Sequence, residues 1–172
     1  MKTIFTLLLA ATPALTALTA DWPEYQAPDK QFTAAFPGNV TVKQAQNRYP
    51  FGLVTITAHT HTADKDTVWR IATHDYPAAF VKQITPAKLM DVMARGMTKN
   101  VNGKITGPQP VKHAGYAGIE FQVTATAPNS HAIHARLFTI DARVYQLTLV
   151  AKPNAPAHKE VKKFFDSFKP TN

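Results

Sequence analysis

The chain has 172 residues, 45% of them hydrophobic, which fits a single domain with a sizeable core. It contains no cysteine, and this excludes disulfide bonds, thiolate metal sites, a catalytic thiol and a lipid anchor attached through cysteine. Its formal net charge of +8 favours anionic partners such as phospholipid head groups, anionic glycans or an acidic protein.

Residues 1–20 have the layout of a secretory signal peptide. Lys2 is followed by the apolar run Ile4–Ala11, then by Pro13 and the small-residue stretch Ala17–Ala20. The apolar run is too short for a transmembrane helix, so we predict cleavage after Ala20 rather than an uncleaved anchor. We therefore expect an exported, periplasmic or secreted protein with no transmembrane segment in the mature chain. Nucleic acid is a poor candidate partner for such a protein.

The first half of the mature chain predicts four strands and a helix. Residues 21–30 (DWPEYQAPDK) predict an extended leader before a domain over residues 31–172. Alternating apolar and polar residues predict strands at Gln31–Phe36, Val40–Gln44, Phe51–His61 and Val68–Asp75. A helix should begin with Thr85 as N-cap and end at Asn102-Gly103. Its buried stripe is expected at Leu89, Val92, Met93 and Met97.

The second half predicts more strands and a last helix. Extended segments are expected at Lys104–His113, Ala117–Thr126, His131–Ile140 and Arg143–Ala151. The last of these strands is apolar on both faces, which predicts a covered, central position. The final helix must bury Val161, Phe164, Phe165 and Phe168. The expected fold class is therefore α+β, a single domain in which amphipathic helices flank an antiparallel β-sheet.

Five stretches of the chain together match a known family pattern. They are FTAAFPGNV, IATHDYP, GYAGIEFQVTA, ARLFTIDARVYQLTLVA and FFDSFK, spread over about residues 31–169. In these stretches the chain resembles the small exported bacterial proteins with a PsbP-like α/β/α sandwich. The resemblance implies that fold and an accessory or binding subunit, as in photosystem II assembly, rather than an enzyme. It carries over no catalytic residue, because the matching stretches are turns, strands and a helix end.

His59 and His61 are the sharpest local candidates for chemistry. Residues two apart on a strand point to the same face, so both imidazoles could bind Zn²⁺ or Cu²⁺. Such a site needs a third ligand, for which His74 and Asp75 are candidates. The threonines around the pair are equally typical of a polar, exposed strand. We therefore expect no cofactor, and at most weak surface binding of Zn²⁺ or Cu²⁺.

His134 and Arg136 share one face of their predicted strand and form a second candidate. The neighbouring strand presents Glu120, Gln122 and Thr124 to them. This arrangement could bind an anion or a partner protein. A solvated outer face with a cross-strand ion pair is the favoured interpretation.

No complete catalytic motif is present in the sequence. Asp75 beside Tyr76 could serve acid–base chemistry, but Pro77 favours a turn that simply ends the strand. The chain lacks a nucleophile elbow, a P-loop and a dinucleotide-binding glycine pattern. The methionines of the predicted helix are more typical of a core than of a copper site.

The expected function is that of an exported, non-enzymatic accessory or binding protein of the bacterial envelope. Its mark would be an exposed apolar or aromatic patch. The first alternative is a periplasmic protein that binds a metal or small ligand with His59 and His61. The second is an enzyme of unknown reaction, whose mark would be a deep pocket with perturbed titratable groups.

Processing provides a first test of these expectations. If residues 1–20 are a signal peptide, the mature protein begins at or near Asp21 and carries a net charge of +7, because Lys2 is the only charged residue lost. Intact-mass measurement of the protein from the extracytoplasmic fraction checks this. A mass that retains Met1–Ala20 would contradict cleavage.

Overall fold

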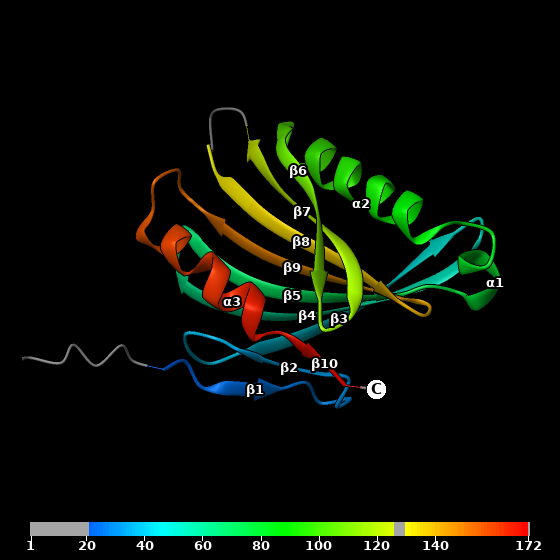
Figure 1. Cartoon of the computed structure of the whole chain (residues 1–172), viewed down its shortest axis with the longest axis horizontal. Helices are drawn as coiled ribbons and strands as arrows, with labels where there is room; N and C mark the ends of the chain where they lie inside the picture. Colours follow the sequence, from blue (N-terminus) through cyan, green and yellow to red (C-terminus); the bar gives the residue numbers. More distant parts are fainter. Residues whose placement is uncertain (1–20, 126–129, 172) are drawn as a thin grey trace, which may run out of the picture.

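The computed structural model describes residues 21–125 and 130–171, so the predicted signal peptide and Thr126 lie outside the described residues. Its centre is a seven-stranded antiparallel sheet with the order β3-β4-β5-β9-β8-β7-β6 (Figure 1). The strands are β3 (Thr41–Tyr49), β4 (Gly52–Asp64), β5 (Thr67–Asp75), β6 (Gly103–His113), β7 (Tyr116–Ala125), β8 (Ala132–Ile140) and β9 (Arg143–Ala151).

Strand β9 lies at the middle of this sheet, between β5 and β8. Tyr145, Leu147 and Leu149 point to one face and are buried, while Val144 and Thr148 are buried on the other. The predicted central position of this strand is therefore confirmed, and both faces of the sheet need a cover.

The strand predicted at Val40–Gln44 is longer than expected. It continues to Tyr49 and returns through the two-residue turn Pro50-Phe51, so the next strand, predicted from Phe51, begins at Gly52. All nine residues of β3 are exposed. An edge strand without a dry face has no apolar alternation, so periodicity gave no signal for its second half.

A three-stranded sheet forms a separate layer, with the order β1-β2-β10. Its strands are β1 (Glu24–Gln26), β2 (Phe32–Ala35) and β10 (Lys169–Pro170). The expected leader at residues 21–30 thus includes a strand paired with β2, and Ala27 within it is buried. The sheet joins the two ends of the described chain.

Helix α2 (Pro86–Asn100) covers the β6–β8 half of one face of the large sheet (Figure 1). The predicted N-cap is confirmed, since the Thr85 hydroxyl accepts a hydrogen bond from the Lys88 N–H at 3.3 Å. Val92, predicted in the buried stripe, is 50% exposed. The buried side contains Met90 and Ala94, and a residue two positions from Met90 points to the opposite side of a helix.

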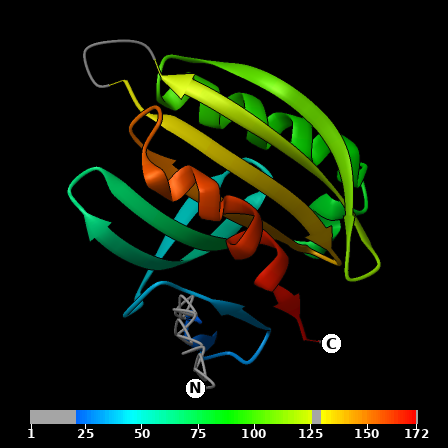
Figure 2. The same cartoon turned by 60° about the vertical axis from the view of Figure 1, so that its left-hand side comes forward.

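The opposite face of the sheet is covered by the small sheet and α3 (Val161–Ser167), which follows the 3₁₀ helix η1 (Pro156–Glu160) (Figure 2). The expected α+β domain with an antiparallel sheet and flanking helices is confirmed in outline. The strand predicted at Gln31–Phe36 is present as β2, but its place in a second sheet was not predicted, because its partners β1 and β10 have only three and two residues, too few for a periodic pattern. Within the two described ranges, no helix is long and apolar enough to span a bilayer.

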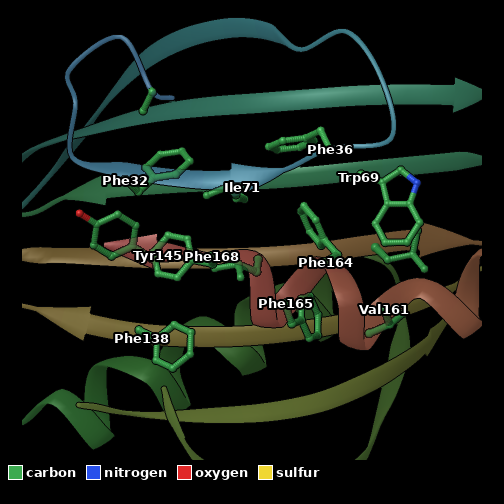
Figure 3. Close-up of a cluster of buried hydrophobic side chains, with 14 of the residues drawn as sticks. Phe32, Phe36, Trp69, Ile71, Phe138, Tyr145, Val161, Phe164, Phe165 and Phe168 are labelled. Atoms are coloured by element: carbon green, nitrogen blue, oxygen red, sulfur yellow. The ribbon is translucent and has the colours of Figure 1, made fainter. Parts of the chain in front are cut away.

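The core between α3 and the sheets is largely aromatic (Figure 3). Phe164 makes edge contacts with Trp69 of β5 and Phe36, each with ring centroids 5.2 Å apart. Phe168 stacks on Phe138 of β8 at 6.0 Å. The burial predicted for the last helix is confirmed at all four positions, Val161, Phe164, Phe165 and Phe168.

Removal of a ring from this core should destabilise the fold strongly. Phe165→Ala and Phe168→Ala should each lower the free energy of unfolding by roughly 3–5 kcal/mol, because each leaves a cavity among fixed neighbours. Urea unfolding measures the change. Val92→Ala is the control and should stay within about 0.5 kcal/mol of the wild type, since its side chain is exposed. Changes of similar size in all three variants would contradict the docking of α3.

Candidate binding surface

His59 and His61 both face the small-sheet side of β4, as their spacing predicts. His59 is 2% exposed, its Nδ1 is hydrogen-bonded with the Tyr25 hydroxyl at 2.9 Å, and its ring makes an edge contact with Phe32. Burial lowers the pKa of His59 and thus favours its neutral form. His61 Nδ1 donates to the Asn39 carbonyl oxygen at 2.9 Å. Each ring therefore has a protein partner of its own.

Neither candidate third ligand joins these histidines. His74 pairs with Ile56, whereas His59 pairs with Ile71, so alternation places His74 on the opposite face of the sheet. Asp75 shares the face of His59, but its carboxylate accepts a hydrogen bond from Arg143. Among the residues that the structure describes, no three His, Asp or Glu side chains are placed to hold a metal ion.

The turn after β5 is the strand end that Pro77 predicts. The Tyr76 N–H donates to the Ala142 carbonyl oxygen, and Pro77 precedes α1 (Ala78–Val81) as its N-cap residue. Asp75 is bound by Arg143, which also donates to Asp29 at 2.9 Å. An open cavity of about 530 Å³ adjoins Asp75 and Arg143. These ion pairs connect residues 21–30 to β5 and β9. Asp75 and Arg143 therefore have a structural role.

Arg136 is buried and binds two partly exposed carboxylates, so it does not lie on a solvated surface. It donates to Glu120 of β7 at 2.6–2.7 Å, so the predicted cross-strand ion pair is confirmed. Its Nη1 also donates to Asp166 of α3 at 3.1 Å, and its guanidinium lies 4.9 Å from the centre of the Phe165 ring. The prediction of a solvated face was wrong, because α3 covers this part of the sheet.

His134 is also engaged within the protein. Its Nε2 lies 2.7 Å from Nδ1 of His158, whose Nε2 donates to the Lys152 carbonyl oxygen at 2.8 Å. Burial, and secondarily the neighbouring His158, lowers the pKa of His134. His134 therefore holds η1 against β8, and Arg136 holds α3 against the same strand.

Four aromatic side chains, two exposed and two half-buried, form a group at the end of the β3–β4 hairpin. We call Tyr49, Phe51, Tyr76 and Phe80 the hairpin-end cluster. The Phe51 ring is nearly parallel to those of Tyr49 and Phe80, with centroids 5.0 and 4.0 Å away. Tyr76 lies 5.7 Å from Phe80 and 6.3 Å from Phe51. The rings hold one another in a fixed stack.

The topology of the sheet brings these rings together. Because β4 and β5 are antiparallel, the start of β4 lies beside the end of β5, so the β3–β4 turn meets α1 (Figure 1). Gly52 closes the turn with φ of +128°, and a Cβ there would approach Pro77 Cγ to 2.7 Å. Glycine is thus required for the close approach of the hairpin tip to the start of α1.

The hairpin-end cluster is open to solvent. Tyr49 is 42% exposed and Phe51 38% exposed. Leu53, which pairs with Arg48 and so points to the face opposite Tyr49, is 40% exposed. These residues are three of the five exposed large hydrophobic residues in the described chain. Sequence analysis missed this surface, although a signal exists. The stretches RYPFG and DYPAAF each contain Tyr-Pro followed by Phe, the first in the β3–β4 turn and the second at the start of α1. Only the strand order shows that the two segments meet.

Comparison with known proteins identifies the fold. No family model matches the chain, and no curated protein matches it in sequence. The chain is similar to the cyanobacterial PsbP of Synechocystis sp. PCC 6803, with a TM-score of 0.62 and 12% identity, over 95% of this chain and 99% of that one. It is also similar to a protein from Bacteroides thetaiotaomicron VPI-5482, with a TM-score of 0.52 and 10% identity, over 88% and 49%. The predicted PsbP-like fold is confirmed, and identities this low extend the likeness to the fold alone.

Metal titration tests the histidine pair. We expect weak Zn²⁺ binding, equal in the wild type and in the His59→Ala/His61→Ala double variant, because two imidazoles with separate partners do not complete a site. Calorimetric titration of the metal-free protein measures this. Submicromolar binding that the double variant loses would contradict the expectation and favour metal handling as the function.

Acid should destabilise the protein through His74. Burial lowers the pKa of His74 from 6.5 to about 4, with Gln146 hydrogen-bonded to its Nε2 at 3.1 Å. The unfolded chain binds a proton below pH 6.5 and the folded chain does not, so stability is lost as the pH falls from 6.5 towards 4. Between pH 7 and pH 5, His74 should contribute a loss of roughly 1–2 kcal/mol in the free energy of unfolding. In His74→Gln, the free energy of unfolding measured with urea should fall less between pH 7 and pH 5. An unchanged pH dependence would contradict the role of His74 in acid destabilisation.

Proposed function

We propose that this protein is an exported, non-enzymatic accessory protein of the bacterial envelope that binds a partner protein through the hairpin-end cluster. The observation that carries the proposal is Phe51, which stacks on Tyr49 and Phe80 and is still 38% exposed. Aromatic side chains of this kind provide much of the binding energy in protein interfaces.

Order in the unbound surface favours binding. The rings of Tyr49, Phe51 and Phe80 restrict one another, and Gly52 fixes the turn against Pro77. Association normally loses free energy by immobilising interface side chains. Side chains that are already stacked lose less on binding, so a small aromatic surface can support a specific complex.

The remaining features agree with an accessory role in the envelope. The charged, apolar and small-residue order of residues 1–20 supports export. The PsbP-like fold supports a binding subunit only by resemblance, because fold does not determine function. His59 and His61 each have a separate protein partner, and the Asp75 carboxylate is bound by Arg143. Metal handling and acid–base catalysis therefore have less support than partner binding.

Selective capture tests the proposal. The mature protein is immobilised and exposed to extract of the native cell envelope, beside Tyr49→Ala/Phe51→Ala and Val92→Ala. Val92 is the matched control, because it is an exposed apolar residue on α2, outside the cluster. A partner retained by the wild type and Val92→Ala, and lost by the double variant with unchanged unfolding, is the expected result. Equal capture by all three proteins would overturn the role of the cluster.

A further inference from the structure

We infer that β3 is a docking strand, to which an extended acidic segment of a partner protein adds as a further strand of the large sheet. The inference rests on the proposed function and names the chemistry of the partner. In this binding mode, main-chain hydrogen bonds provide affinity, while side chains at alternate positions provide specificity.

The two edges of the large sheet differ in their capacity to accept a strand. The β6 edge contains Pro108 and Pro110, and its register shifts between Thr106 and Gln109. Proline and bulges are the means by which proteins block strand addition at an edge. Strand β3 contains neither proline nor glycine and pairs with β4 at nine consecutive positions without a shift. Only β3 therefore presents an uninterrupted row of outward main-chain groups.

The side chains of β3 leave room for a partner strand. Every residue of β3 is exposed, and Val42 is 43% exposed. On the small-sheet side, a depression of about 300 Å³ runs beside it, lined by Pro28, Asp29, Val42, Gln44, Thr57 and His59. Alternate side chains of an added strand would point into this depression.

Charge indicates the chemistry of the partner. Residues 31–63 contain no Asp or Glu, and they contain two cations, Lys43 and Arg48. Neither cation forms an ion pair within the residues that the structure describes. The register places Lys43, opposite Ala58, on the face away from the depression, and Arg48, opposite Leu53, on the face of the depression.

The depression itself contains the carboxylate of Asp29, which is paired with Arg143, so side chains that enter beside Asp29 should be uncharged. Acidic side chains of the segment would instead pair with Lys43 and Arg48, and complementary charge sets both register and choice of partner.

The same charges disfavour a second copy of this chain as the occupant. Two paired β3 strands would place only cations, Lys43 on one face and Arg48 on the other, with no carboxylate in either strand. Like charges that face each other across a strand pair are destabilising, and lysine on an edge is a known protection against self-pairing. Charge therefore favours an acidic strand over a second β3.

Strand β3 leads directly into the hairpin-end cluster. Its last residue, Tyr49, is one of the stacked rings. A segment paired along β3 would place one end beside Tyr49 and Phe51, where an apolar or aromatic side chain could pack. The β3 edge thus continues into the hairpin-end cluster.

A selection from random peptides of about ten residues, the length that the nine-residue β3 can pair, tests the inference on the immobilised mature protein. The expected peptides are acidic, lack proline at their centres and bind more weakly at high salt. Hydrogen exchange should show protection of β3 amides on binding, and no protection at β6. Lys43→Glu/Arg48→Glu should weaken binding by about tenfold or more. Lys104→Glu/Lys112→Glu is the matched control on β6, with two exposed cations reversed, and should leave binding unchanged.

Other outcomes separate this inference from the proposed function. Failure to select any peptide, equal loss in both charge variants, or self-association through β3 would overturn strand addition. Peptides that require Tyr49 and Phe51 but leave the β3 amides unprotected would overturn it too, while the aromatic surface would stand. Peptides that protect the β3 amides, and whose affinity is unchanged in the Tyr49→Ala/Phe51→Ala variant, would support strand addition. They would count against a role of the hairpin-end cluster in binding.

Discussion

The burial of β9 on both faces is the constraint on which the rest of the structure depends. Leu147 and Thr148, adjacent in the chain, are both buried although they point in opposite directions. Two covers are therefore required, and α2 provides only part of one of them. The other cover cannot be α3 alone, because a helix of seven residues spans only about 10 Å. The small sheet completes it with Phe32 and Phe36, which contact Phe168 and Phe164.

Covering this face also brings polar side chains into the interior. Arg136 lies under α3, and its guanidinium is satisfied by Glu120 and Asp166. A buried charge without partners would be strongly unfavourable, so these contacts are a condition for docking α3. The hydrogen bond between His134 and His158 likewise holds η1 against the sheet. His134 and Arg136, candidate binding residues in the sequence, thus connect the large sheet to η1 and α3.

The sequence predicted elements whose signal lies within one segment. Alternation located the strands of the large sheet, Thr85 located the start of α2, and the aromatic spacing identified the buried side of α3. It did not predict the small sheet, because β10 contains two residues and its pairing with β2 joins distant parts of the chain. For the same reason, spacing placed His59 and His61 on one face but could not show Tyr25 and Asn39 as their partners.

The hairpin-end cluster also could not be predicted from one segment, because its formation depends on strand order. Its rings come from the tip of the β3–β4 hairpin and from the segment that runs from the end of β5 into α1, which are adjacent because β4 and β5 are neighbours. These rings contact one another and α1, whereas the core rings between α3 and the sheets connect both layers. The two aromatic groups therefore differ in position, since the buried group lies between the layers and the hairpin-end cluster lies at the edge of the sheet. In the function that we propose, the partly exposed rings of the hairpin-end cluster contact a partner protein. The position of this cluster at the end of the uninterrupted β3 edge would then offer that partner both a template for main-chain pairing and an apolar anchor.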